Sequence, residues 1–299
     1  MSYETYRVTD LIDEIAMGPF GSNIKVSCFV DSGVPVLNGS NLEGFSLSEK
    51  AFRFVTKEKA DSLNKANAHR GDIVITHRGT LGQIVFIPQD SRYDRYVISQ
   101  SQFRVRCNDK VLPEYLVYYF HTPIGQHKLL SNASQVGVPA LARPSSTFQQ
   151  IEVELPELSI QKRVVEIITT IQKKIENNQE LNDNLYEMVN AYYTSLFKES
   201  DCEMTTVGNY AERIYSGGTP MTSNAAYWNG TFGWFSSGET RNRFVISTEK
   251  TITQAGIDNS STKLATKYDI VMASAGQGFT RGQISMLLID TYVNQSVIV

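Results

Sequence analysis

The sequence predicts a mixed α/β fold in which two copies of one domain are joined by a long coiled-coil-type helix. Three observations lead to this prediction: an uninterrupted heptad pattern over 156–199, short β-type runs on both sides of it, and motifs that recur at a nearly fixed offset. We therefore expect fold class α/β (α+β), with a first domain at 1–155, a spacer helix at 156–200 and a second domain at 201–299.

The first domain contains runs that are typical of short strands. These runs are VPVL (34–37), DIVIT (72–76), QIVFI (83–87) and QFRVRC (102–107), and turns rich in Gly, Asn and Pro separate them. A helical pattern covers 113–130. We expect a break at Thr122-Pro123, because proline is poorly tolerated inside a helix.

The long helix is the clearest local prediction. Residues 156–199 lack glycine and have a single proline, at the start, so about 40 residues can extend roughly 60 Å as one helix. Apolar residues recur at alternating steps of four and three, which indicates a seam for a second helix. Two asparagines in the seam would reduce stability but fix the register. The seam consists of Val164, Ile168, Ile171, Ile175, Asn178, Asn182, Leu185, Val189, Tyr192 and Leu196. The alternative is an amphipathic helix packed only on a domain of its own chain.

The segment after the helix repeats the first domain. Asp72-Ile73-Val74 corresponds to Asp269-Ile270-Val271, Gly82-Gln83-Ile84 to Gly282-Gln283-Ile284, and Ser99-Gln100-Ser101 to Asn294-Gln295-Ser296. VPVLNGSNL (34–42) likewise matches FGWFSSGET (232–240). The offset stays between 195 and 200 residues, which indicates duplication of a whole domain. Because Val299 lies opposite 102–104 of the first copy, we expect the second copy to be incomplete and to lack its own distal helix.

Composition limits the classes of protein that fit. The longest apolar runs are too short to cross a bilayer, and the N-terminus lacks the features of a signal peptide. Cys28, Cys107 and Cys202 are scattered, as expected of reduced thiols in a cytoplasmic protein. The net charge is −3, yet residues 50–110 hold 12 Lys and Arg against 6 Asp and Glu. This basic block is either a surface that faces phosphate or an ordinary solvated face.

Catalytic motifs are not apparent. The sequence lacks a phosphate-binding GxxxxGK[ST] loop, HExxH, GxSxG, and the Asn-Pro-Pro-aromatic motif of amino-methyltransferases. The glycines around Gln277 follow a strand-like run without opening a helix, which favours a turn over a dinucleotide site. The four histidines form no metal-ligand pattern. We therefore expect a chain that is not an enzyme and holds no metal.

Polar turns after the strand-like runs contain side chains suited to DNA. Arg, Lys, Asn, Gln, Ser and Thr supply the donors and acceptors used in the grooves, although such residues are also ordinary in turns. The predicted DNA-binding residues are Ser22, Asn23, Lys25, Asn38, Asn41, Thr76, Arg78 and Thr80 in the first copy, and Thr219, Ser237, Ser274, Gln277 and Arg281 in the second.

Together these features resemble the DNA specificity (S) subunit of type I restriction-modification systems. The resemblance rests on the helix start PELSIQKRVVEII with its polar middle IENNQELNDNLYEM, on YSGGTPMTSNAAYWNGTFGWFSSGET (215–240), and on the DIV, GQI and QS skeleton of both copies. It covers nearly the whole chain. The family architecture is two target-recognition domains, each followed by a long helix, with the helices paired antiparallel.

The resemblance implies a function and a set of partners. The chain would read a bipartite double-stranded DNA target, and its helix would set the spacing between the half-sites. It would dock methyltransferase (M) subunits and a restriction/translocase (R) subunit. S-adenosylmethionine, ATP and Mg²⁺ would be bound by those partners, with no cofactor in this chain.

The expected lack of a second helix departs from the family pattern. It suggests that the spacer helix pairs with the same helix of another copy, as a homodimer. Two other functions remain open: a non-DNA protein-interaction module built around the long helix, which a specific DNA footprint would eliminate, and a nuclease, which metal-dependent cleavage by the chain alone would support.

Overall fold

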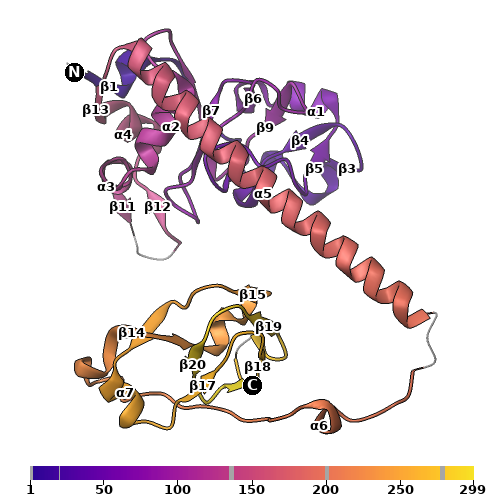
Figure 1. Cartoon of the computed structure of the whole chain (residues 1–299). Coiled ribbons are helices and arrows are strands. Elements are labelled where there is room, and N and C mark those ends of the chain that lie inside the picture. The colour runs from indigo at the N-terminus through magenta and orange to yellow at the C-terminus, as the bar shows by residue number, and fades with distance from the viewer. Residues whose placement is uncertain (1–2, 20, 135–137, 199–201, 277–279) are drawn as a thin grey trace. The chain divides into compact units, whose positions relative to one another are not determined.

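Figure 1 shows the computed structural model of the chain, which describes residues 3–19, 21–134, 138–198, 202–276 and 280–299. The chain forms two compact units, Met1–Asn190 (unit 1) and Ala191–Val299 (unit 2), which we describe separately. Each unit combines sheets with short helices, and one long helix, α5 (Leu158–Lys198), follows the sheets of unit 1. The predicted mixed α/β class with a long helix is therefore confirmed.

Unit 1 is built on two main sheets. One has five strands in the order β3 (Phe29–Val30), β5 (Arg53–Val55), β4 (Val34–Val36), β9 (Arg95–Val97) and β6 (Asn67–His69). The other has four, in the order β2 (Ile12–Met17), β10 (Gln102–Cys107), β7 (Ile73–Thr76) and β8 (Ile84–Phe86). Two small ribbons pair β1 (Glu4–Arg7) with β13 (Glu152–Leu155) and β11 (Ala133–Ser134) with β12 (Ala140–Leu141). Within the main sheets β4 and β9 run parallel, whereas the other pairs are antiparallel.

Strand β7 is the centre of unit 1, because both of its faces are buried. Ile73 and Ile75 pack into a core with residues of helices α2 (Pro113–His121) and α4 (Pro144–Gln150). Val74 points the other way, into a second core with Tyr96 of β9 and with Leu37, which directly follows β4. The remaining helices of this unit are α1 (Lys57–Ser62), α3 (Pro123–Leu130) and the 3₁₀ turns η1 (Val8–Leu11), η2 (Gly21–Asn23), η3 (Val26–Cys28), η4 (Gly39–Leu42) and η5 (Asn64–Ala66).

The helical segment after β10 breaks where the proline predicts. Helix α2 ends at His121 and α3 begins at Pro123. Between them, the Thr122 hydroxyl caps α3 by accepting a hydrogen bond of 3.1 Å from the Gly125 amide. Capping satisfies one of the free N–H groups of the new helix.

An ionic network centred on the buried Asp72, which directly precedes β7, joins β2 and β10. The Arg104 guanidinium donates to Glu14 at 2.7 Å and to Asp72 at 3.3 Å, and Arg106 donates to Asp72 at 2.9 Å. Asp72 is fully buried, and the arginines compensate the cost of burying its charge. The hydrogen bond from Arg104 lowers the pKa of Glu14 below its ordinary value.

Helix α5 is fixed to unit 1 near its start. The Gln161 side chain is buried; it accepts from the Leu112 amide at 3.0 Å and donates to the Pro156 carbonyl at 3.0 Å. About three turns later along α5, the Tyr118 hydroxyl donates to Gln172 at 3.0 Å. From Lys173 to Lys198 every helix residue is exposed. Only the first part of the helix therefore packs on its own unit.

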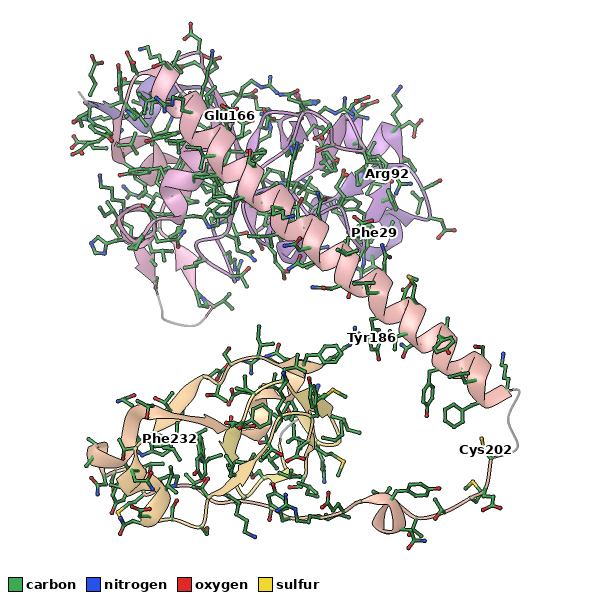
Figure 2. All side chains as sticks on the ribbon, in the orientation of Figure 1. Phe29, Arg92, Glu166, Tyr186, Cys202 and Phe232 are labelled. Atoms are coloured by element: carbon green, nitrogen blue, oxygen red, sulfur yellow. The ribbon has the colours of Figure 1, made fainter. Side chains whose placement is uncertain are left out.

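The residues of the predicted heptad seam also differ in burial between the first part of α5 and the rest. Val164 and Ile168 are half-buried, whereas Ile171, Ile175, Asn178, Asn182, Leu185, Val189, Tyr192 and Leu196 are exposed. Figure 2 shows the side chains projecting from this part of α5. The reading of α5 as an amphipathic helix packed only on its own unit thus accounts for its beginning and leaves the apolar residues of its second half unexplained.

Unit 2 also has two main sheets. One has the order β16 (Lys250–Ile252), β14 (Trp228–Phe235), β20 (Thr291–Val293) and β17 (Lys263–Ala265); the other has β15 (Phe244–Val245), β19 (Ile284–Leu287), β18 (Ile270–Ala273) and β21 (Val297–Ile298). Its helical segments are α6 (Val207–Tyr210), η6 (Ala225–Tyr227), η7 (Ser237–Arg241) and α7 (Gln254–Asp258). Phe235, Val271 and Leu287 lie in its core.

The two units repeat each other in hydrogen-bond register. Asp72 accepts from the His69 amide at 3.0 Å, and Asp269 accepts from the Thr266 amide at 2.8 Å. Two further correspondences were predicted and are also present: Gly82 and Gly282 have φ of 86° and 85°, and the amides of His77 and Ser274 bind the carbonyls of Ser101 and Ser296 at 2.8 and 2.9 Å. The predicted duplication therefore extends to individual turns.

Within the described residues, no helix combines the length and apolar character needed to cross a membrane. The same ranges contain no group of three or more His, Cys, Asp and Glu side chains arranged to hold a metal ion.

Candidate nucleic-acid interface

Four polar loops of unit 1 meet at one edge of its sheets. They follow the C-terminal ends of β2, β4, β7 and β9, and β4 and β9 end together because they run parallel. The loop after β7 contacts the turn after β9, since the His77 amide donates to Ser101 and the His77 ring nitrogen Nε2 lies 3.2 Å from the Gln100 carbonyl. Residues distant in sequence therefore form one surface.

Glycines bring the loop after β2 against the turn after β9. A Cβ at Gly18 would lie 1.9 Å from the Ser99 carbonyl oxygen, and one at Gly21 would lie 2.1 Å from Oε1 of Gln100. The first contact is with backbone, so Gly18 cannot be replaced without moving the turn. This approach explains why a Gly-rich loop follows β2.

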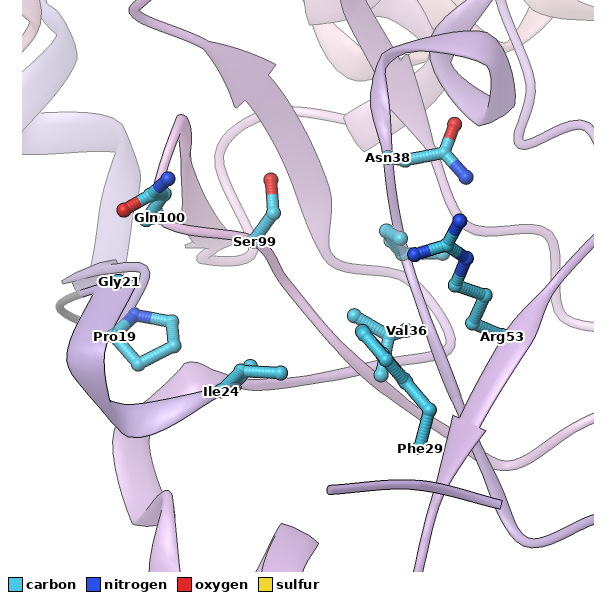
Figure 3. Close-up of a pocket in the computed structure, with 10 residues that line it drawn as sticks. Pro19, Gly21, Ile24, Phe29, Val36, Asn38, Arg53, Ser99 and Gln100 are labelled. Carbon is cyan, nitrogen blue, oxygen red and sulfur yellow. The ribbon is translucent and has the colours of Figure 1, made fainter. Parts of the chain in front are cut away.

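A pocket of about 370 Å³ lies between these loops (Figure 3). Ile24, Phe29 and Val36 supply apolar walls, while Asn38 and Arg53 lie on one side and Ser99 and Gln100 on the other. The Arg53 guanidinium carbon lies 5.3 Å from the centre of the Phe29 ring, a cation–π arrangement that orients the guanidinium. The pocket thus combines one cation, two side-chain amides and apolar walls.

Four of the seven arginines in the basic block of residues 50–110 form ion pairs inside unit 1. Arg70 pairs with Asp94 at 3.0 Å and Arg95 with Asp61 at 2.5 Å, and Arg104 and Arg106 share Asp72. By contrast, Arg53 and Arg78 have no ion pair within the described ranges, and both are exposed. Burial lowers the pKa of His77 below its ordinary 6.5, which favours the neutral form of this imidazole.

The predicted residues of the first copy fall into two groups. Asn23, Lys25, Asn38, Arg78 and Thr80 are exposed on or beside these loops, and nothing is described for the Ser22 side chain. Asn41 and Thr76 are buried. The Asn41 side chain accepts from the Asn38 amide and donates to the carbonyls of Ser48 and Lys50, so it stabilises η4. We therefore leave Asn41 and Thr76 out of the interface proposed below.

The predicted residues of unit 2 occupy equivalent turns. The Thr219 hydroxyl donates to Gln295 at 2.5 Å, Ser237 is half-buried in η7, and Ser274 and Arg281 are exposed. Gln277 lies outside the described residues. The η7 turn matches η4: the Ser236 amide donates to Glu239 at 2.9 Å as Asn38 donates to Asn41 at 3.0 Å.

Arg53, Phe29 and Gln100 line the pocket but are not among the site residues predicted from the sequence. Gln100 was visible as part of the repeated Ser-Gln-Ser skeleton. Arg53 could have been found by aligning RFVT (53–56) with KTIT (250–253), two runs that each end in the threonine that caps a helix. The contact with Phe29 depends on pairing between β3 and β5, which sequence alone does not reveal.

The chain is similar in sequence to one protein family and to two curated proteins. The family model described as type I restriction modification DNA specificity domain matches residues 3–187. The specificity subunit of the type I restriction enzyme EcoR124I/EcoR124II from Escherichia coli is 30% identical over 183 residues, which cover 56% of this chain and 43% of that protein. The specificity subunit of the type I restriction enzyme HindI from Haemophilus influenzae is 29% identical over 143 residues, 44% of this chain and 29% of that protein.

A solved structure agrees with the fold. The S subunit of a type I restriction-modification system from M. genitalium superposes with a TM-score of 0.59 at 14% identity, covering 99% of this chain and 71% of that one. The matched segments span less than half of the two curated relatives.

Proposed function

This chain belongs to the type I restriction modification DNA specificity domain family, and we propose that it is a sequence-specific DNA-binding subunit without catalytic activity of its own. The observation that carries the proposal is the edge of unit 1 where polar loops surround Arg53, Asn38 and Gln100. Arginine and side-chain amides are the groups that read base edges in the major groove of DNA. Arg78 and Lys25 are exposed in neighbouring loops and would supply further positive charge for contacts with DNA.

We further propose that each unit reads one part of a bipartite double-stranded DNA target. The two units repeat the same turns with different side chains, for example Asn38 and Ser236 at the start of η4 and η7. A common framework with different exposed residues would allow two different half-sites to be read. Helix α5, with 41 residues, would set the distance between them.

The partners follow from the same proposal. Methyltransferase subunits would supply S-adenosylmethionine and carry out methylation, and a restriction/translocase subunit would supply ATP- and Mg²⁺-dependent activities. The exposed seam of α5 is a candidate pairing surface, because Ile171, Ile175 and Val189 face solvent at heptad spacing. We propose that it pairs with a second long helix, that of another copy when the chain acts alone.

The test is to purify the chain in complex with the methyltransferase subunit of its own system and to select bound sequences from a random pool of double-stranded DNA. The proposal predicts enrichment of one sequence, with specific binding at least about 10³-fold tighter than non-specific binding at physiological salt. Binding without enrichment would contradict sequence-specific recognition. A stable protein complex with no DNA affinity would favour the alternative, a protein-interaction module.

A further inference from the structure

Arg53 lies on β5 beside Val36 of β4, the strand that leads into the Asn38 turn. Its guanidinium is stacked on Phe29, lacks an ion pair within the described part of the chain, and faces the pocket together with Asn38 (Figure 3). Four of the seven arginines in residues 50–110 form ion pairs inside unit 1, namely Arg70, Arg95, Arg104 and Arg106. Arg53 is therefore a charged group that is oriented by the fold yet available to a ligand.

Unit 2 has the same arrangement at the equivalent positions. Lys250 is the strand partner of Trp234 as Arg53 is of Val36, and the Lys250 ammonium lies 5.9 Å from the centre of the Trp228 ring. Phe29 and Trp228 are themselves equivalent, because they pair with Val55 and Ile252. Both copies thus place a cation on an aromatic ring at the same point of the sheet, although neither residue is the same.

The neighbouring turn is repeated as well. Gln100 and Gln295 are both exposed in the turn that precedes β10 or β21, and the backbone hydrogen bonds of His77 and Ser274 fix the same register. An exposed cation contributes little to folding stability. The recurrence of an exposed cation on an aromatic ring in both units, together with a glutamine that recurs in the same turn, therefore indicates a role in ligand recognition.

We propose that Arg53 is a specificity-determining residue of the first half-site, positioned by Phe29 to read a guanine in the major groove, with Gln100 reading a neighbouring base pair. This inference rests on the proposed DNA-binding function. Arginine is the usual reader of the guanine O6 and N7 atoms, and glutamine pairs with the N6 and N7 atoms of adenine. Lys250 would occupy the equivalent place for the second half-site.

The composition of the pocket favours a base edge over a phosphate. A phosphate site gathers several cations or backbone amides, whereas this pocket has a single cation, neutral amide side chains, and apolar walls from Ile24 and Val36. An apolar wall suits the methyl group of thymine. Stacking on Phe29 also limits the freedom of the Arg53 side chain before binding, which favours a directional contact.

The test uses the complex with the methyltransferase subunit and compares the DNA selected by wild type, Arg53→Ala and Phe29→Leu. Arg53→Ala should bind the wild-type sequence about tenfold to hundredfold more weakly, and one G·C position of the selected sequence should become degenerate while the others persist. Phe29→Leu should weaken selection at the same position to a smaller extent. The matched control is Arg92→Ala. Arg92, labelled in Figure 2, is another exposed arginine stacked on an aromatic ring, that of Tyr93, and neither residue lines the pocket.

Melting temperatures of the variants establish that each complex is folded. An equal loss of affinity on all sequences, with the selected sequence unchanged, would make Arg53 a phosphate contact and overturn the inference. Unchanged binding by Arg53→Ala would place it outside the interface. If wild type selects a sequence and Arg53→Ala selects the same one, only this inference fails; if wild type selects none, the proposed function fails with it.

Discussion

Gly71 and Tyr268 occupy the same position in the two units, and both have a left-handed backbone, with φ of 83° and 77°. Each precedes the aspartate that caps the turn before β7 or β18, and each donates its amide to a carbonyl of the facing segment, Ile87 at 2.8 Å or Leu287 at 2.7 Å. Glycine adopts this conformation freely, whereas a residue with a Cβ is strained there by about 1–2 kcal/mol. The repeat has therefore preserved a turn geometry that Tyr268 does not favour.

Replacing Tyr268 by glycine should stabilise unit 2. Relief of strain should exceed the entropic cost of glycine, so we expect a net gain of about 0.5–1 kcal/mol. The Leu287 amide donates to the Asp269 backbone carbonyl at 3.0 Å. Its hydrogen-exchange rate in the full chain would measure the change in local stability. Gly71→Ala is the converse control and should destabilise unit 1. Faster exchange in Tyr268→Gly would show that the tyrosine ring contributes more than the strain costs.

The buried network around Asp72 should be essential for unit 1. Asp72→Asn leaves two arginines without their shared carboxylate, and loss of one partner of a buried ion pair costs about 3–5 kcal/mol. Chemical denaturation followed by fluorescence would measure the change. Asp269→Asn is the matched control: Asp269 has the same turn hydrogen bond from Thr266 but no ion pair in the described ranges, so about 1 kcal/mol is expected. Equal effects of the two substitutions would contradict this assignment.

Acid should destabilise unit 1 partly through Glu14. Its pKa is lowered by the hydrogen bond from Arg104, so the folded state resists protonation that the unfolded state accepts near 4.5. The contribution of Glu14 is therefore complete above that pH and is lost as the pH falls through the folded pKa. Denaturant midpoints of wild type and Glu14→Gln should differ at pH 6 and converge toward pH 3. A difference that stays constant with pH would exclude ionisation as the source.

Self-association should depend on the exposed seam of α5. Val189→Glu places a charge in the seam, and we expect it to convert a dimer of the isolated chain, at micromolar concentration, into monomer. Thr194→Glu adds the same charge on the opposite side of the helix and should leave the dimer intact. Light scattering would distinguish the two states. A monomeric wild type, or dissociation by both substitutions, would refute pairing through this face.

Arg78 should contact the same DNA as the residues that line the pocket. It is exposed in the loop after β7 and bridges to Ala140 through its backbone only, which leaves its side chain available. We expect Arg78→Ala to weaken target binding by about 1–3 kcal/mol if it reads a base, with relaxed specificity at one position. An equal loss on all sequences would identify a phosphate contact, with a smaller salt dependence as its signature. Unaltered binding would remove Arg78 from the interface.

Much of the fold could be predicted because its signals are local. The heptad spacing of α5, the proline between α2 and α3, and the repeated Asp72 and Asp269 turns depend only on nearby residues. The site was harder to predict, because exposure depends on tertiary contacts. Asn38 and Asn41 are equally polar in sequence, yet η4 turns one toward the pocket and buries the other under Ser48 and Lys50.

The position of Arg53 illustrates the same limit. Its sequence neighbours predict an ordinary strand, and its significance depends on Phe29, which lies 24 residues earlier and pairs with the same strand. The basic block of residues 50–110 likewise does not reveal which cations are available to a ligand. Arg104 and Arg106 carry the same charge as Arg53, but they form ion pairs with Glu14 and Asp72.

The most direct measurement for the whole account is a genome-wide map of methylated adenines in cells that express this chain with the methyltransferase subunit of its system. A strain that lacks the chain serves as the reference. If the chain directs recognition, methylation should appear at one defined sequence of two separated half-sites, and only when the chain is expressed. Methylation that is absent, or unchanged by removing the chain, would contradict the claim that it directs sequence-specific DNA recognition.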